Sequence, residues 1–135
     1  MNYIALNKVD IYQKENLVLK NISFNVSKGE FIYLVGKTGS GKSSLLKSLY
    51  AEIVVKNGSI AVLDQNLIKI KKRKILALRR KLGIIFQDFQ LLPDRSIYDN
   101  LKFVMKATGW KRKSKIKSSI DELLSKVSMQ DKAHK

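Results

Sequence analysis

Hydrophobic and polar residues alternate in two segments near the N-terminus, residues 4–11 and 17–26. A period of two is typical of β-strands with one buried face, so each segment is predicted to be a strand. A third apolar run, at 31–35, leads directly into a glycine and is predicted to be a strand as well. The later pattern predicts a helix from Lys42 to near the Asn57-Gly58 turn, short strands at 59–63 and 83–86, and helices at roughly 74–81, 96–107 and 112–127.

Residues 36–43 read Gly-Lys-Thr-Gly-Ser-Gly-Lys-Ser, which is the complete G-x-x-x-x-G-K-S pattern of a phosphate-binding loop. Its glycines allow successive backbone N–H groups to face a phosphate, and the start of the following helix adds further donors. The alternative is a glycine-rich turn without a ligand. The predicted strand before the motif and helix after it favour nucleotide binding. The residues expected to contact the nucleotide are Gly36, Lys37, Thr38, Gly39, Ser40, Gly41, Lys42, Ser43 and Ser44.

The loop predicts ATP and Mg²⁺ as ligands. Lys42 is expected to reach the β- and γ-phosphates, and the Ser43 hydroxyl is expected to coordinate magnesium. The single histidine, His134, lies in a polar tail and is predicted to be solvated rather than catalytic.

The chain is strongly basic, with 27 Lys and Arg residues against 11 Asp and Glu residues and a net charge of +16. Basic residues concentrate in two regions, 69–81 and 101–135. Such runs occur at anionic membrane surfaces and on nucleic acids, but they also occur on ordinary solvated faces. All three interpretations stay open, with nucleic acid the least favoured. Because the chain has no cysteine, disulfides and thiolate metal sites are excluded.

Several short motifs follow one another in a particular order: Tyr12, Leu19-Lys20-Asn21-Ile22-Ser23-Phe24, Lys28-Gly29-Glu30-Phe31, the phosphate loop and Leu82-Gly83-Ile84-Ile85-Phe86-Gln87. In this order, the motifs resemble the nucleotide-binding domain of ABC-type ATPases over essentially the whole chain. Within that family, the segment from Phe86 to Asn100 most resembles the cell-division ATPases of the FtsE type. ATPases that export lipoproteins or small molecules share its Phe-Gln and Leu-Leu-Pro parts but usually differ at 94–100.

This resemblance implies roles for residues outside the loop. Tyr12 matches the aromatic residue that stacks on adenine, although an ordinary strand tyrosine is an equal alternative. Gln87 matches the glutamine that meets magnesium or water and signals to a membrane partner. The resemblance also implies a homodimer, an integral membrane partner like FtsX, and a cytoplasmic location on the inner face of the cell membrane.

The predicted fold class is α/β: a P-loop NTPase core of the ABC type with an antiparallel β subdomain and the start of a helical subdomain. The β subdomain and core are expected at 1–87, and the glutamine loop and first helices at 88–135. The Leu-Ser-Gly-Gly-Gln signature, the strand ending in Asp-Glu and the switch histidine of the family do not occur in this sequence. The chain is therefore expected to be a partial domain that binds ATP without turning it over. An ABC export ATPase and a basic nucleic-acid-binding or inactive fragment are the alternatives.

Overall fold

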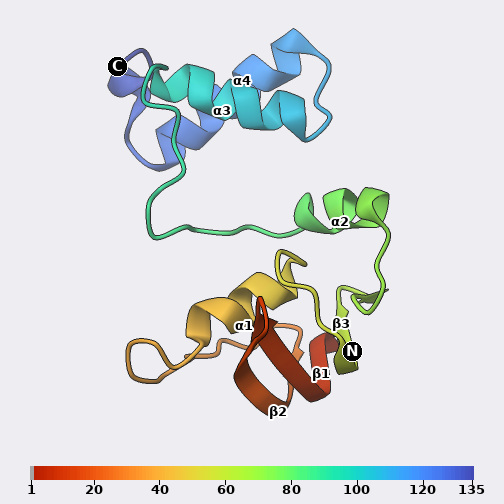
Figure 1. Cartoon of the computed structure of the whole chain (residues 1–135). Helices are drawn as coiled ribbons and strands as arrows, with labels where there is room; N and C mark the ends of the chain where they lie inside the picture. Colours follow the sequence, from red (N-terminus) through yellow and green to blue (C-terminus); the bar gives the residue numbers. More distant parts are fainter. Residues whose placement is uncertain (1) are drawn as a thin grey trace. The chain divides into compact units, whose positions relative to one another are not determined.

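The computed structural model describes residues 2–135, which form two units, one ending at Gly83 and one running from Ile84 to Lys135 (Figure 1). Each unit has its own cluster of buried apolar side chains. No helix among the described residues is both long and apolar enough to cross a membrane.

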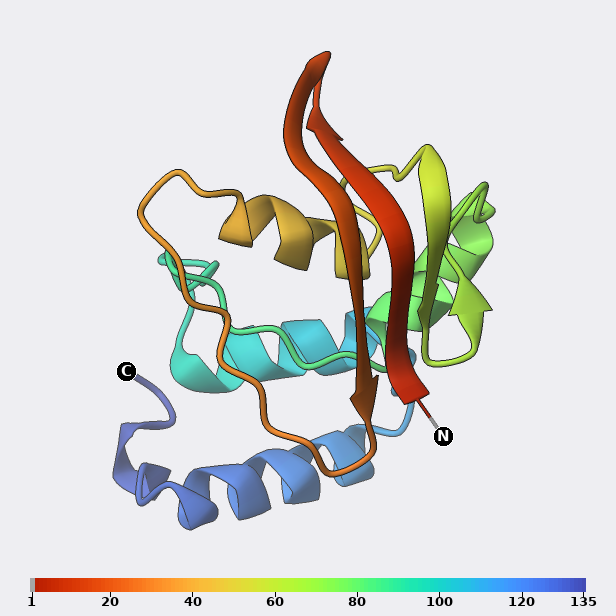
Figure 2. The same cartoon turned by 90° about the horizontal axis from the view of Figure 1, so that it is seen from below.

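A four-stranded antiparallel sheet forms the framework of the first unit, in the order β2-β1-β3-β4. Strands β1 (Asn2–Gln13) and β2 (Asn16–Ser27) make a long curved hairpin, which confirms both N-terminal strand predictions (Figure 2). Strand β3 (Asn57–Val62) pairs with the other edge of β1, and β4 (Gln65–Asn66) pairs with β3. The predicted strand at 59–63 is therefore confirmed to within two residues.

Two helices complete this unit, α1 (Lys42–Leu49) and α2 (Lys72–Arg79). Helix α1 packs against β1 through Leu45, and α2 contributes the buried Leu78. Burial of apolar area in this cluster is the main source of stability for the unit. Its fully or nearly buried members are Leu6, Val9, Ile11, Leu45, Val55, Ile60, Val62, Leu67 and Leu78.

Asp10 joins the three long strands. Its carboxylate accepts hydrogen bonds from the backbone N–H of Asn21 on β2 (2.8 Å) and from the side-chain amide of Asn57 on β3 (3.2 Å). These two bonds, with the backbone bond the stronger influence, hold the pKa of Asp10 below its ordinary value. The ionised carboxylate is therefore the form that the native sheet favours.

The strand predicted at 31–35 is absent. Phe31 and Val35 are 81% and 88% exposed, and no strand is assigned between β2 and α1 (Figure 2). The short buried strand predicted at 83–86 is also wrong, because Ile85 is 98% exposed and lies in coil. A strand needs a neighbouring strand to accept and donate its backbone hydrogen bonds, and neither segment has one among the described residues.

Helix α1 ends eight residues earlier than the turn signal at Asn57-Gly58 predicted. The backbone N–H of Glu52 donates to the carbonyl of Lys47, and that of Ala51 donates to Ser48, the two bonds of a Schellman motif. Ala51 adopts a left-handed conformation with φ 56°. Helix termination therefore depends on an alanine in a conformation that usually selects glycine, which the sequence pattern does not reveal.

The second unit contains two α-helices joined by a short connection, α3 (Ile97–Ala107) and α4 (Lys113–Lys126). The short 3₁₀ helix η1 (Gln130–Lys132) follows them. Both α-helices confirm the sequence prediction. Ile116, Ile120 and Leu124 of α4 are buried, and they pack with partly buried apolar residues of α3 such as Leu101. The first turn of α3 is tied to the C-terminal segment, since the N–H groups of residues 97 and 98 donate to the carbonyls of residues 135 and 133.

The entry to α3 is fixed by side-chain hydrogen bonds. Ser96 caps the helix by accepting from the backbone N–H of Asp99 (3.1 Å). Asn100 accepts from the backbone N–H of Leu92 (2.9 Å) and donates to three carbonyls, including that of Leu92 (3.0 Å). These contacts give the side chains of Ser96 and Asn100 a structural role at the start of α3.

Candidate nucleotide-binding site

The phosphate loop occupies residues 36–41, between the irregular segment after β2 and the first turn of α1 (Figure 2). Gly41 is the residue that turns the loop into the helix, with φ 91° at the N-cap position. A Cβ built there would lie 2.9 Å from side-chain carbons of both Val18 and Leu19 on β2. Only glycine satisfies both the left-handed backbone and this close approach, so β2 itself selects the glycine.

Lys42 holds the loop together. Its ammonium donates to the carbonyls of Gly36 (2.6 Å) and Lys37 (2.8 Å) and lies 3.4 Å from the Ser40 hydroxyl oxygen. An ammonium has three N–H donors, so two strong bonds and one long one use all three. The long contact with Ser40 is the weakest of the three, and it is the one that a phosphate oxygen can replace while the loop stays closed around the other two.

The first turn of α1 presents backbone donors beside this lysine. Gly41 has no side chain that could cap the helix, and the first turn contains no acidic residue. The N–H groups of Lys42, Ser43 and Ser44 therefore have no intrahelical acceptor, and they add to the positive end of the helix dipole. This combination of uncapped amides and an ammonium suits a phosphate group.

The two serines of this turn differ in their surroundings. Ser43 is exposed, whereas Ser44 is buried, with 8% of its surface accessible. An exposed hydroxyl beside the phosphate donors fits a magnesium ion, which takes one or two protein oxygens together with phosphate oxygens and water. Among the described residues no group of three or more His, Cys, Asp or Glu side chains could hold a metal without such help. Magnesium would thus be held by Ser43 and by the nucleotide itself.

The remaining loop residues are open to solvent. Lys37, Thr38, Gly39 and Ser40 are all exposed, and the N–H of Ser40 donates to the carbonyl of Lys37 (3.1 Å), which closes a tight turn. An apolar cavity of about 580 Å³ adjoins the inner side of the loop, between β2, residues 32–35 and α1. Its lining is apolar except for Asn25 and the loop residues Gly36, Ser40 and Lys42, so the cavity suits a triphosphate less well than the open face of the loop does.

Tyr12 lies near the end of β1, directly after the buried Ile11. It pairs with Leu17 on β2, and Ile11 pairs with Leu19, the residue that contacts Gly41. The end of the hairpin that carries Tyr12 therefore lies on the loop side of the sheet. Tyr12 is half-buried, and within residues 2–135 its ring takes part in no aromatic stack.

Gln87 belongs to the second unit, where it is exposed in the irregular segment that precedes α3. The structure thus brings together the loop, the first turn of α1 and the hairpin end with Tyr12 within the first unit. Gln87, in contrast, belongs to the helical unit. The roles of Tyr12, Ser43 and Gln87 stay predictions.

The family is decided by comparison with known proteins. The family model described as ABC transporter matches residues 19–135. The chain belongs to the ABC transporter family. The resemblance found in the motifs is therefore confirmed, and it covers all of the second unit and most of the first.

Two relatives are similar to the chain over most of its length. The cell division ATP-binding protein FtsE of Streptococcus pneumoniae is 40% identical over 121 residues, which cover 90% of this chain and 52% of that protein. The methionine import ATP-binding protein MetN of Helicobacter pylori is 34% identical over 124 residues, covering 92% of this chain and 38% of that protein. The chain therefore spans about half of the length of the FtsE proteins that it matches.

A solved structure confirms the fold class. The ATP-binding cassette MJ0796, in a dimeric post-hydrolysis state bound to ADP and Pi, matches with a TM-score of 0.82. The match covers 97% of this chain and 60% of that one, at 23% sequence identity. The fold of this chain, an antiparallel sheet followed by helices, is therefore consistent with the N-terminal part of an ABC ATPase domain.

Several residues outside the motif support the loop or the helix that follows it, and the sequence pattern does not reveal them. Val18 and Leu19 select Gly41, and Arg79 of α2 donates to the carbonyls of Tyr50 (3.0 Å) and Ala51 (3.2 Å) at the end of α1. Arg79 belongs to the basic region 69–81, so one cation of that run has a structural role: it satisfies the carbonyls of a helix C-terminus. Nothing in the spacing of the basic residues distinguishes it from its neighbours.

Proposed function

We propose that this chain is the nucleotide-binding part of an FtsE-like ATPase subunit, which binds MgATP at residues 36–44 and couples that binding to a membrane protein in bacterial cell division. The observation that carries the proposal is the Lys42 ammonium, held at the centre of a closed phosphate loop whose strongest contacts are to backbone carbonyls. The 40% identity to FtsE over 90% of the chain supports the choice within the family.

Each predicted site residue has a role in this proposal. The loop amides and Lys42 bind the β- and γ-phosphates, Ser43 and the phosphates hold magnesium, and Tyr12 stacks on adenine. Gln87 reports the state of the nucleotide to the membrane partner. The ADP and Pi in the MJ0796 dimer support a nucleotide of this class and a homodimeric active form.

The proposed partner is an integral membrane protein like FtsX, with the ATPase held peripherally on the inner face of the cell membrane. A methionine-type importer or an exporter of lipoproteins or small molecules is the second candidate, and the 34% identity to MetN favours keeping the importer. Both share the nucleotide chemistry and differ in the membrane protein they engage.

Two experiments test the nucleotide site and the membrane partner separately. Calorimetric titration of the folded chain with MgATP tests the nucleotide site, and absence of binding by a folded sample contradicts it. Co-expression with tagged FtsX-like and methionine-permease-like membrane proteins from the same genome tests the partner. Co-purification with the permease alone would replace the cell-division assignment by the import assignment and leave the nucleotide site untouched.

A further inference from the structure

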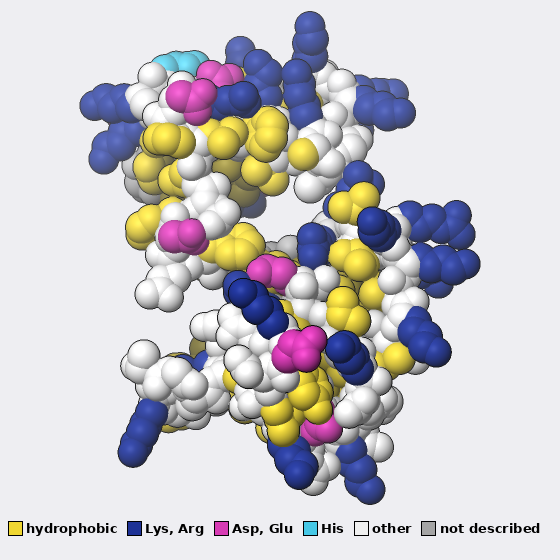
Figure 3. All heavy atoms as spheres, viewed as in Figure 1, with side chains coloured by type: hydrophobic (Ala, Val, Ile, Leu, Met, Phe, Trp, Pro, Cys, Tyr) yellow, Lys and Arg dark blue, Asp and Glu magenta, His cyan; other side chains and the backbone are white. Residues whose placement is uncertain are grey.

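A basic surface lies at the end of the second unit where α3 is joined to α4. Residues 100–120 contain seven Lys and Arg residues and no Asp or Glu. Figure 3 shows Lys and Arg side chains gathered over this end of the helix pair. The seven residues are Lys102, Lys106, Lys111, Arg112, Lys113, Lys115 and Lys117.

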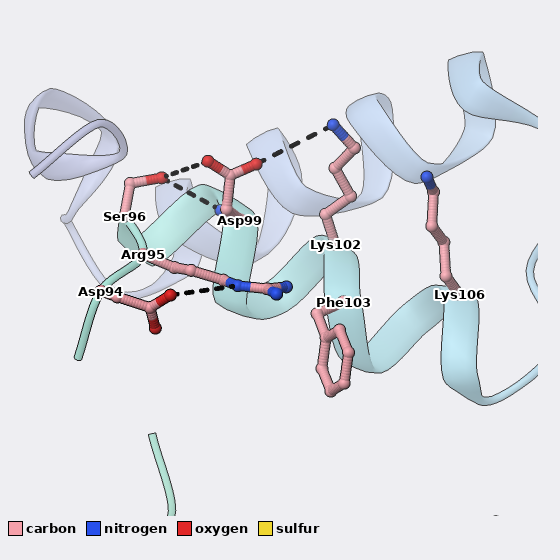
Figure 4. A pocket seen from close by; sticks show the side chains of 7 residues that line it. All are labelled: Asp94, Arg95, Ser96, Asp99, Lys102, Phe103 and Lys106. Atoms are coloured by element: carbon pink, nitrogen blue, oxygen red, sulfur yellow. Dashed lines mark hydrogen bonds and ion pairs between the residues drawn. The ribbon is translucent and has the colours of Figure 1, made fainter. Parts of the chain in front are cut away.

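Two hollows divide this surface. The first, of about 420 Å³, lies between the helices and is lined by four lysines, Lys102 and Lys106 from α3 and Lys113 and Lys117 from α4. Figure 4 shows that Lys102 and Lys106 extend from α3 in the same direction, whereas Phe103 points away from them. No carboxylate lines this hollow.

The second hollow, of about 490 Å³, lies along the connection itself. It is lined by Trp110 and by the basic residues Lys111, Arg112 and Lys115. Trp110 is 44% exposed, and its backbone N–H donates to the carbonyl of Met105 (3.0 Å), which holds the connection at the end of α3. An indole is therefore displayed among cations at the tip of the unit.

The charges on this surface lack compensation. Among the described residues only Lys102 of the seven makes an ion pair, with Asp99 at 3.8 Å. Helix α4 also begins here without a side-chain cap and without an acidic residue in its first turn. Like charges repel, so cations gathered beside the positive end of a helix dipole create a positive potential that favours an external anion.

A neighbouring hollow shows the contrast. It is also bordered by Lys102 and Lys106, but Asp94 and Asp99 line it as well (Figure 4). There Asp94 approaches Arg95 at 4.0 Å and Asp99 pairs with Lys102 at 3.8 Å, so two of the three cations that line this hollow have a carboxylate beside them. The basic surface between α3 and α4 differs from this hollow in having no carboxylate in its lining.

We propose that this end of the helix pair, with Trp110 at its tip, binds the anionic phospholipid headgroups of a bilayer surface. Lysines hold headgroup phosphates in the hollow between α3 and α4, and the indole of Trp110 inserts at the level of the headgroups, where tryptophan is favoured. Clusters of four to eight basic residues at a helix are the sequence feature of anionic lipid recognition. Six of the seven cations are lysines, which suit diffuse attraction to a charged surface better than the bidentate contacts that arginine makes with nucleic acid.

This surface shares no residue with the phosphate loop, so the proposal goes beyond nucleotide binding and each of the two can fail alone. It also differs from engagement of a membrane protein, because it requires lipid only. Trp110 is the single tryptophan of the chain. Its fluorescence therefore reports directly on insertion.

The test uses the purified 135-residue chain without nucleotide at an ionic strength of about 0.15 M, where exposed charges more than about 8 Å apart are largely screened. Vesicles of phosphatidylglycerol and phosphatidylcholine in equal parts are compared with vesicles of phosphatidylcholine alone. We expect co-sedimentation and a blue shift of the tryptophan emission with the anionic vesicles only. Co-sedimentation without the blue shift, or equal binding to both vesicles, overturns the proposal.

Charge-matched variants place the binding on this surface. In the double variant Lys113→Gln/Lys117→Gln the partition coefficient should fall about 25-fold, or about fivefold for each lysine removed. The control Lys72→Gln/Lys74→Gln loses the same charge on α2 and should change partitioning less than about twofold, since its lysines lie outside the surface. Circular dichroism verifies that both variants are folded. Equal losses in the two variants would show that net charge alone is responsible and would overturn the assignment.

A nucleic-acid competitor tests the other macromolecule that a basic surface attracts. A single-stranded oligonucleotide is added to protein bound to anionic vesicles, at equal concentrations of phosphate. We expect the protein to stay on the vesicles with its emission still shifted. Release by the oligonucleotide, with direct binding to it that Lys113→Gln/Lys117→Gln abolishes, would show that the surface is for nucleic acid and not for lipid.

Discussion

Removing the Lys42 ammonium is the sharpest perturbation of the nucleotide site. In Lys42→Ala the loop loses both short contacts of the ammonium, 2.6 Å to Gly36 and 2.8 Å to Lys37, and also the only side-chain cation positioned at its centre. The backbone amides of the loop and of the first turn of α1 remain. The variant therefore separates the contribution of the charge from that of the amides.

The magnitude follows from the number of charge-assisted bonds that a phosphate would receive. The geometry leaves one donor of Lys42 in a weak 3.4 Å contact with Ser40 and so available for a phosphate oxygen. A hydrogen bond to a charged group contributes about 1.5–3 kcal/mol, and rearrangement of a loop that has lost its centre adds to this. We expect a loss of about 2–4 kcal/mol, which raises the Kd for MgATP about 30-fold to 900-fold.

Isothermal titration calorimetry with MgATP measures this change, and Lys37→Ala is the matched control. The control removes one exposed cation from the same loop but keeps the Lys37 carbonyl that accepts from Lys42. Its Kd should rise less than about fivefold, because an exposed charge contributes at most about 1 kcal/mol. Thermal unfolding without nucleotide shows whether either variant is misfolded. Equal affinity of wild type and Lys42→Ala in folded samples would refute the proposed site.

Four further results are expected. Ala51→Gly should stabilise the first unit by about 1 kcal/mol, because Ala51 occupies a left-handed position at φ 56°; unchanged or lower stability in urea would contradict the Schellman geometry. Asn100→Ala should destabilise the second unit by about 1–2 kcal/mol through loss of its bonds to Leu92 and to the carbonyl of the cap residue Ser96, so hydrogen exchange at α3 should be faster in the variant than in wild type while exchange at β1 is unchanged; equal rates at α3 in wild type and variant would argue against this role. Asp10 has a lowered pKa, so its stabilising contribution is complete above about pH 4 and disappears as the pH falls through the folded pKa; the stability of Asp10→Asn should therefore fall less steeply below pH 4, and parallel acid titrations would count against it. Finally, the folded chain alone should release phosphate from MgATP at a background rate, because its sequence has neither the Asp-Glu strand end nor the Leu-Ser-Gly-Gly-Gln signature of the family; turnover on the order of 1 s⁻¹ that Lys42→Ala abolishes would show the opposite.

The sequence predicted the elements that their own apolar spacing or turn signals mark, including β3, whose partner β1 lies far away along the chain. The β1–β2 hairpin and the α3–α4 pair are confirmed because each buries its apolar face against a neighbouring segment. The loop and its place before α1 were also predicted, since that motif is contiguous. These features depend on local spacing, which a sequence displays directly.

Other features depend on contacts that spacing does not display. The apolar run 31–35 has the composition of a strand, but a strand exists only when another strand pairs with it, and the hydrophobic pattern does not identify the partner. The reason for glycine at 41 lies on β2, in Val18 and Leu19. The roles of Tyr12 and Gln87 rest on family resemblance, and they stay predictions.

The segment 31–35 has no strand partner among the described residues, and it leads directly into Gly36, the residue whose carbonyl accepts the shortest bond from Lys42. If the competent loop is populated in only a fraction of molecules, the apparent Kd equals the intrinsic Kd divided by that fraction. We expect that a strand pairing with 31–35 would hold Gly36 in place, raise this fraction and so tighten nucleotide binding. Linkage is reciprocal, so the nucleotide would then favour that pairing by the same factor and would stabilise the sheet as well as the loop.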